Sequence, residues 1–272
     1  ADGYPAESLY GCQNRTVVVS ARRGEVANKH KPVLEKYGVR NIHLYEPGEE
    51  WVTYQPKGKM LVLPEIYPGG IQIPKRLIGS SILHLPTMKT HVFTTMTGAM
   101  KNAFGGLLHE KRHWTHSRIH ETLVDLLQIQ QDIHTGIFAV MDGAFAGDGA
   151  GPRAMRWHEK GVILAGADQV AIDAVAASMM GFDPLSIGFI RMAHEAGLGT
   201  GDLREIEIAG DDVSGVNWGF RTGDTFASRG QKMIYWGPLR PLEKLILRTW
   251  LVPWSYLASI LYHDVFWYPL VG

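Results

Sequence analysis

The 272-residue chain contains a single cysteine, Cys12, although it contains 12 histidines. One cysteine excludes a disulfide framework, and it excludes a zinc or iron–sulfur site built only from thiolates of this chain. We therefore expect no iron–sulfur cluster held by the chain itself. A metal bound here would have imidazole and carboxylate ligands, with Fe, Ni and Zn as the candidate divalent ions.

The chain also lacks a surplus of charge, because 27 Lys and Arg residues balance 27 Asp and Glu residues. This balance argues against nucleic acid as a partner, since phosphate binding normally needs a basic excess. No uncharged apolar run reaches about 18 residues, so no conventional membrane span is predicted. No signal-peptide pattern opens the sequence, and its first residue is Ala rather than Met. We expect a cytoplasmic protein, with a removed leader as the alternative.

Short apolar runs alternate with helical patterns along most of the chain. The runs predict strands at 17–20, 42–45, 60–63, 82–85, 137–141, 162–165 and 206–209. The patterns predict helices at 26–37, 117–133, 169–180 and 187–196, and Asp168 and Gly181 are typical caps of the third helix. This alternation predicts an α/β fold, a mostly parallel sheet flanked by helices. A division near residue 135 would give two lobes with a cleft between them.

The C-terminal segment differs from the rest in being apolar and aromatic. We assign residues 1–243 to the α/β domain and residues 244–272 to an aromatic helix and tail. One interpretation is that this segment packs over the core. The alternative is that residues 245–272 form an oligomer interface, bind a protein partner or lie on a membrane surface.

Four histidines follow a helical spacing: His109, His113, His116 and His120 are separated by 4, 3 and 4 positions. On a helix they would share one face, where two imidazoles one turn apart can chelate a metal. We predict His113, His116 and His120 as metal ligands. The alternatives are proton transfer, anion binding and purely structural hydrogen bonds.

A polar stretch follows the predicted strand at 82–85. It contains Lys89, His91, Lys101 and Asn102, which we predict as catalytic residues, and Thr97, which we predict to bind the substrate. Ligands of α/β proteins bind beyond the carboxyl ends of strands, and hydroxyls and lysines without neighbouring acids suit an anion. The alternative is a polar loop with solvated lysines.

A glycine-rich segment with two aspartates, residues 142–153, follows the predicted strand at 137–141 and is read as a loop. Its glycines would let the backbone approach a ligand closely. We predict Asp142 as a catalytic residue that orients a histidine or serves as a base. Asp148, Arg153 and Asp173 are predicted to bind the substrate, with Asp173 as an alternative partner of a histidine or metal. An ordinary irregular loop is the other interpretation.

Several of these segments together resemble the domain of unknown function 362 family. The resemblance rests on 89–91, 97–105, 141–143, 149–152 and 165–173, in that order, and covers roughly residues 70–210. Many relatives carry an added ferredoxin-type module with cysteine-bound iron–sulfur clusters. This chain departs from them because it lacks those cysteines, so the resemblance implies that electrons for a redox role would come from another protein.

A looser similarity connects the chain to the lactate racemase family, which binds a nickel-pincer cofactor through a His…Lys segment at a glycine-rich turn. His91 and Lys101 have a similar separation with Gly98 between them, and His113, His116 or His120 would correspond to that family's metal-binding histidine. The neighbouring pattern departs, because Lys101 is followed by Asn and the glycine pair comes after it.

These features predict an enzyme of isomerase or oxidoreductase type. It would move a proton or hydride to or from an anionic, carboxylate-bearing small molecule with the help of a metal or of histidine and lysine. A non-catalytic or electron-transfer component of a larger assembly, docked through the aromatic tail, is one alternative. A binding protein for an anionic metabolite is the other.

Overall fold

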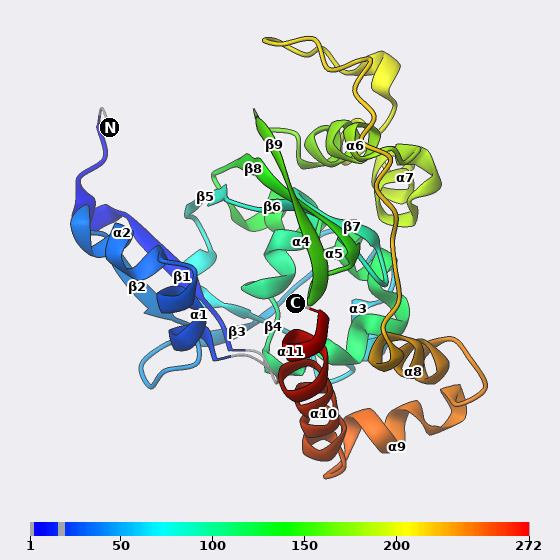
Figure 1. Ribbon diagram of the computed structural model, residues 1–272. Coiled ribbons are helices and arrows are strands. Elements are labelled where there is room, and N and C mark those ends of the chain that lie inside the picture. The colour runs from blue at the N-terminus through cyan, green and yellow to red at the C-terminus, as the bar shows by residue number, and fades with distance from the viewer. Residues whose placement is uncertain (1–2, 16–19, 272) are drawn as a thin grey trace.

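A computed structural model describes residues 3–15 and 20–271 and confirms the α/β class (Figure 1). The strands are β1 (Tyr10–Gln13), β2 (Arg40–His43), β3 (Trp51–Tyr54), β4 (Ile71–Pro74), β5 (Ser81–His84), β6 (Thr87–His91), β7 (Thr95–Thr97), β8 (Gly136–Ala150) and β9 (Ala154–Gly166). The α-helices are α1 (Ala21–Ala27), α2 (His30–Lys36), α3 (Leu63–Ile66), α4 (Ala99–Asn102), α5 (Ile119–Ile133), α6 (Gln169–Met180), α7 (Gly188–Glu195), α8 (Phe226–Tyr235), α9 (Glu243–Arg248), α10 (Val252–Leu261) and α11 (Tyr268–Val271).

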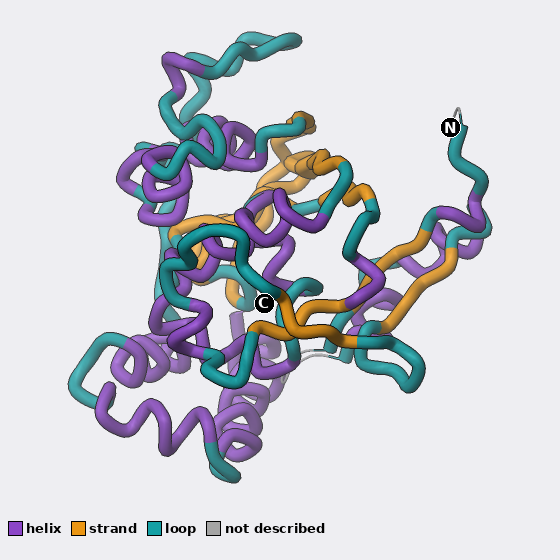
Figure 2. Tube along the Cα trace, turned by 180° about the vertical axis from the view of Figure 1, so that it is seen from behind, coloured by secondary structure: helices purple, strands orange, loops and turns teal. Residues whose placement is uncertain are grey.

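The central sheet has five strands in the order β5–β8–β6–β7, and β9 also pairs with β8. The long strand β8 runs parallel to β5 at its start and parallel to β6 further along. Strands β7 and β9 pair antiparallel with β6 and β8. Figure 2 shows the strands in orange from the opposite side. Strand β6 therefore lies in the interior of the sheet, next to the short helix α4.

Helices α4 to α7 pack on the sheet and supply most of the core. Leu123 and Leu126 of α5, Phe189 of α7 and Met88 of β6 are fully buried. Helix α6 is capped at its N-terminus by Asp168, whose carboxylate accepts from the backbone N–H groups of residues 170 and 171, and at its C-terminus by Gly181, where φ is 100°. The predicted helices at 117–133, 169–180 and 187–196 are thus confirmed as α5, α6 and α7.

The N-terminal region forms a smaller layer, in which β1 and β2 pair in parallel beside α1 and α2 (Figure 1, blue). The helix predicted over 26–37 is wrong as one continuous element, because the chain turns at Lys29, where φ is 59°. The strand predicted at 17–20 falls mostly on residues 16–19, which lie outside the described residues. Strands β3 and β4 form an antiparallel pair next to this layer.

Four other local predictions need correction. Residues 60–63 form no strand, because the N–H groups of Leu61, Val62 and Leu63 bind the Asp125 carboxylate as the chain enters α3. Residues 206–209 form no strand either. The glycine-rich segment is mainly the second half of β8 rather than a loop, and the segment holding Lys89 and His91 is itself strand β6.

Glycine explains why β8 continues where a loop was predicted. A side chain at Gly143 would lie 2.6 Å from the Val162 Cγ2 atom of β9, and one at Gly147 would lie 3.1 Å from the Lys89 Cβ atom of β6. The missing side chains let three strands approach closely along this segment. The pattern that suggested a loop therefore reflects close strand packing.

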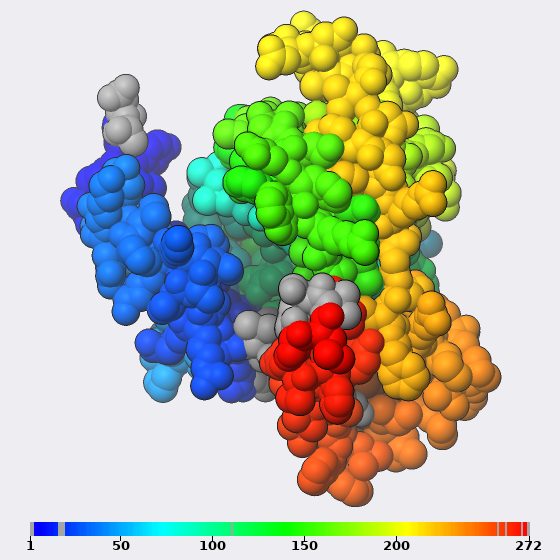
Figure 3. Space-filling view, in the orientation of Figure 1, coloured from blue at the N-terminus to red at the C-terminus, as the bar shows by residue number. Residues whose placement is uncertain are grey.

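The C-terminal helices α8 to α11 lie at one end of the molecule, beside the long β8–β9 hairpin (Figure 3, orange and red). A π-helical segment, η8 (Tyr262–Trp267), joins α10 to α11. The aromatic C-terminal helix predicted from the sequence is present. In the part of the chain that the structure describes, no helix is both long enough and apolar enough to cross a membrane.

Candidate functional site

A cavity of about 570 Å³ lies between β6, α4, the 3₁₀ helix η4 (Glu110–Arg118) and the C-terminal helices. Its size is within the usual range of ligand sites, roughly 300–1,000 Å³. Its lining residues include four basic side chains and four histidines but no described acidic side chain. The basic and imidazole side chains are Lys89, Lys101, Arg112, Arg153, His91, His113, His116 and His263. A cavity with this lining favours an anion.

Lys101 of α4 and Lys89 of β6 face this cavity from two elements. Burial lowers the pKa of Lys101 to about 7, and the charges of Lys89 and Arg112 act in the same direction. The Lys101 ammonium lies 5.1 Å from the centre of the Phe104 ring. Burial also lowers the pKa of Lys89, while the charge of Asp142 opposes that shift. Neutral Lys101 is thus available near neutral pH.

Arg112 was not predicted from the sequence, although it lies within the histidine segment. It is only 7% exposed, and its Nη1 atom has no hydrogen-bond partner among the described residues. Burial lowers its pKa to about 10, so it remains charged at neutral pH. A buried charge without a partner is costly. The geometry therefore leaves room for an anionic ligand beside Arg112.

His116 and His91 are neutral imidazoles held in defined orientations. His116 Nδ1 donates to the backbone oxygen of His113 at 3.0 Å, which leaves its Nε2 atom as an acceptor. Its ring stacks on Tyr235 with 5.6 Å between ring centres, and burial lowers its pKa to about 3. His91 Nδ1 accepts from the Phe93 N–H at 3.1 Å, so its Nε2 carries the proton. Burial keeps the pKa of His91 well below its usual value.

Of the three histidines predicted as metal ligands, His113 and His116 line the cavity and His120 does not. His113 Nε2 donates to the Leu247 oxygen at 2.9 Å, while His120 Nδ1 accepts from the Phe189 N–H at 3.1 Å, outside the cavity lining. Across residues 3–15 and 20–271, no three His, Cys, Asp or Glu side chains are grouped so that they could hold a metal ion. The continuous helical face expected from the spacing is interrupted, because His113 and His116 belong to the 3₁₀ helix η4 whereas His120 belongs to α5.

Asp173 does not line the cavity but binds the backbone at the N-terminal end of α4. Its carboxylate accepts from the N–H groups of Ala99 at 2.6 Å and Met100 at 3.1 Å. Burial raises its pKa to about 7, although these two hydrogen bonds oppose the shift. Gly98 permits the contact, since a side chain there would lie 2.0 Å from Asp173 Oδ1. Asp173 thus binds the first N–H groups of α4, the helix that carries Lys101, from outside the cavity lining.

Asn102 lines the cavity at the end of a buried hydrogen-bond chain that sequence reasoning missed. Its Nδ2 donates to His84 Nδ1 at 3.1 Å, and His84 Nε2 donates to Gln130 Oε1 at 2.6 Å. Burial lowers the pKa of His84 to about 4, so the ring stays neutral and keeps this donor order. These two hydrogen bonds connect Asn102 through His84 to Gln130 of α5 and fix its side chain. The only signal in the sequence was a histidine, His84, within the strand predicted at 82–85.

The remaining predicted residues divide between the cavity and the surface. Thr97 lines the cavity, and Arg153 lines it while pairing with Asp264 at 2.9 Å. Asp142 and Asp148 do not line it. Asp142 accepts from the Ala144 N–H at 2.8 Å, and Asp148 accepts from the Arg221 N–H at 2.7 Å. Both therefore stabilise the hairpin side of the site.

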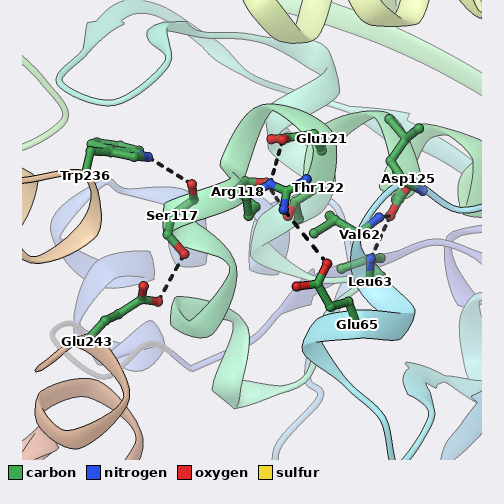
Figure 4. Close-up of polar contacts among 11 residues, drawn as sticks. Val62, Leu63, Glu65, Ser117, Arg118, Glu121, Thr122, Asp125, Trp236 and Glu243 are labelled. Carbon is green, nitrogen blue, oxygen red and sulfur yellow. Dashed lines mark hydrogen bonds and ion pairs between the residues drawn. The ribbon is translucent and has the colours of Figure 1, made fainter. Parts of the chain in front are cut away.

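The C-terminal helices close the cavity through contacts with η4. Trp236 Nε1 donates to the Ser117 backbone oxygen at 2.9 Å, and the Ser117 hydroxyl donates to Glu243 at 3.0 Å (Figure 4). Figure 4 also shows Arg118 between Glu121 and Glu65. These contacts place Tyr235, Tyr256 and His263 in the lining, a role that sequence reasoning did not predict.

Comparison with known proteins gives a family and one curated relative. A family model described as "Domain of unknown function (DUF362)" matches residues 7–178. A thylakoid-associated protein of Synechocystis sp. is 30% identical over 125 residues, which are 43% of this chain and 37% of that protein. The chain therefore spans little more than a third of that relative's length. No solved structure matches the chain.

Proposed function

This chain belongs to the DUF362 family of domains of unknown function, and from that premise we propose that it is an enzyme that binds a small organic anion in the cavity and transfers a proton. The observation that carries the proposal is the cavity lining, which combines four basic side chains with no described acidic one. Arg112 Nη1 supports it, because this atom is buried without a hydrogen-bond partner among the described residues. A bound carboxylate would balance the charge of the basic side chains and would accept a hydrogen bond from Arg112 Nη1.

The basic and imidazole side chains of the cavity would have different roles in this reaction. Arg112 and Lys89 would hold the carboxylate, and neutral Lys101 would accept a proton from the bound molecule. His91 Nε2–H would donate to an oxygen on which charge develops, and His116 Nε2 would accept a hydrogen bond from the ligand. The proposal takes the histidine–lysine form of the sequence prediction, because the described residues assemble no three-ligand metal group. Hydride transfer remains the alternative reaction in the same cavity.

Deuterium exchange tests the proposal. In D₂O, the protein should exchange the C–H hydrogen beside the carboxylate of at least one small mono- or dicarboxylate, measured by proton NMR. Lys101→Met should slow the exchange about 100-fold or more, the usual effect of losing a general base. Lys111→Met is the matched control, because Lys111 is an exposed lysine nearby that does not line the cavity. Equal rates for wild type and Lys101→Met, or no exchange across the panel, would contradict the proposal.

A second candidate function concerns the C-terminal helices, which we propose to lie on a lipid surface. Trp250 is 76% exposed and Trp254 is 64% exposed, and Leu257, Leu261 and Leu270 are exposed along the same segment. Aromatic and leucine side chains beside basic ones are typical of interfacial helices, and Arg240 and Lys244 are exposed nearby. The name of the curated relative, a thylakoid-associated protein, supports a membrane as the partner.

Vesicle sedimentation checks this second candidate. Vesicles containing anionic lipid should pellet the wild-type chain, and Trp250→Ser combined with Trp254→Ser should reduce the bound fraction severalfold. Trp157→Ser is the control, since Trp157 is 73% exposed and belongs to β9 rather than to the C-terminal helices. Self-association that both tryptophan substitutions abolish, without vesicle binding, would instead identify a second copy as the partner and contradict a lipid surface.

A further inference from the structure

A second cavity of about 290 Å³ adjoins the cationic one. It is formed by α8, α9, α10 and η8, and its lining contains no charged side chain among the described residues. The lining residues are Phe226, Ala227, Gly230, Gln231, Ile234, Tyr235, Leu247, Tyr256, Ala258 and Tyr262. Three of them, Gln231, Tyr235 and Tyr256, also line the cationic cavity. The two cavities thus share a wall, and one is lined by basic side chains while the other is lined by uncharged, mostly apolar ones.

We infer that the ligand is an amphiphilic anion, with a carboxylate or phosphate headgroup in the cationic cavity and an apolar chain in the adjoining apolar cavity. The inference rests on the proposed anion site and adds a substrate class to it. Arg112 and Lys101 lie among the lining of the first cavity, while the second offers aromatic and aliphatic walls. An apolar cavity contributes binding energy by removing apolar ligand surface from water.

The shared wall explains how one molecule occupies both spaces. Tyr235 is 4% exposed, and its ring contacts His116 and Phe93 of the cationic cavity at 5.6 Å between ring centres. Burial raises the pKa of Tyr235 above its usual range, so its hydroxyl stays neutral. A chain attached to a headgroup near Arg112 would leave the first cavity along Tyr235 and Tyr256. Tyrosine rings give that passage an apolar surface.

Gly230 provides a way to fill the apolar cavity without altering the cationic one. It lies within α8, lines only the second cavity, and a Cβ atom there would meet no atom within 4 Å. Gly230→Leu should therefore occupy part of the space with little strain. Gly24→Leu is the matched control, because Gly24 also lies within a helix, α1, and its Cβ would also meet open space. Both substitutions replace glycine by a better helix former.

The experiment is a calorimetric titration of the full chain with straight-chain carboxylates from acetate to octanoate and with the matching alkyl phosphates, all below micellar concentrations. Affinity should rise about fourfold for each methylene that enters the apolar cavity. Gly230→Leu should abolish this rise while changing acetate or inorganic phosphate binding less than about twofold, and Gly24→Leu should retain it. Whichever headgroup series binds more tightly identifies the carboxylate or phosphate source.

The other outcomes separate this inference from the proposed function. Binding of short anions with no dependence on chain length overturns the amphiphilic ligand and leaves the anion site intact. A rise with chain length that Gly230→Leu does not change overturns the assignment of the apolar cavity. If no anion in either series binds to the full chain, and thermal unfolding shows that the chain is folded, both the inference and the anion site are overturned.

Discussion

Lys101 and Arg112 show what burial does to single basic residues in this protein. Both face the same cavity, and burial lowers the pKa of Lys101 to about 7 and that of Arg112 to about 10. One side chain is therefore poised to lose its proton near neutral pH, while the other keeps its charge. In the proposed function, this difference would allow Lys101 to act as a base while Arg112 binds the anion.

A pH profile tests the role of Lys101. Its pKa is lowered, so the neutral, proton-accepting form increases as pH rises through about 7. The exchange rate expressed as kcat/KM should therefore rise with pH and level off above an apparent pKa near 7, because this quantity reports the free protein. The kcat profile should be shifted upward, since a bound anion stabilises the ammonium form.

Lys111→Met is the matched control for the pH profile, and its kcat/KM should still rise with pH. Measurement between pH 5 and 9 by NMR-detected exchange is sufficient. A kcat/KM that is flat over this range, or one that falls as pH rises through 7, would show that Lys101 is not the base.

At the scale of elements, α4 has only four residues, Ala99–Asn102, yet it carries two of the predicted catalytic side chains. So short a helix gains little stability from its own backbone hydrogen bonds. Asp173 of α6 holds its first N–H groups, and His84 of β5 holds Asn102 at its end. The position of Lys101 thus depends on packing between α4 and its neighbours.

Gly98→Ala tests this dependence. The new Cβ would lie 2.0 Å from Asp173 Oδ1, so either α4 or Asp173 must move. We expect the free energy of unfolding to fall by about 1–3 kcal/mol, the usual cost of overpacking, and anion affinity to fall with it. Urea denaturation and calorimetric titration provide the two measurements.

The control for this substitution is Gly106→Ala, where a Cβ would meet no atom within 4 Å. It should change stability by less than about 0.5 kcal/mol, as surface substitutions usually do. Wild-type stability and affinity in Gly98→Ala would rule out the positioning role of the Asp173–α4 contact.

At the scale of the whole molecule, the cavity is completed by helices outside the family match. That match ends at residue 178, whereas Tyr235, Tyr256 and His263 line the cavity from α8, α10 and η8. His113 is tied to Leu247, 134 positions away in the sequence. The C-terminal segment is therefore part of the cavity wall.

Tyr256→Ala combined with His263→Ala tests whether the C-terminal wall contributes to binding. We expect anion affinity to fall at least about tenfold, because the cavity opens to water and ligand contacts are lost. Trp254→Ala combined with Leu261→Ala is the control on the same helical segment, since both side chains are exposed and neither lines the cavity. Equal affinities for the two double variants, measured by calorimetry, would contradict this role.

Local sequence determined the elements whose signals lie within a few residues. The Asp168 cap and the Gly181 terminus predicted α6, and apolar periodicity predicted α5 and α7, because helix hydrogen bonds and caps join residues close in sequence. The polar stretch around 89–101, which holds Lys89 and Lys101 without a neighbouring acid, also predicted an anion site. The tertiary structure alone decided which polar groups lack partners and which residues face the cavity. It made β8 a strand through close packing of three chain segments, placed His113 and His116 of η4 but not His120 of α5 in the cavity lining, and placed Arg112 opposite helices more than 100 residues away. The physical reason is that burial and polar pairing depend on distant parts of the chain, which local spacing does not encode.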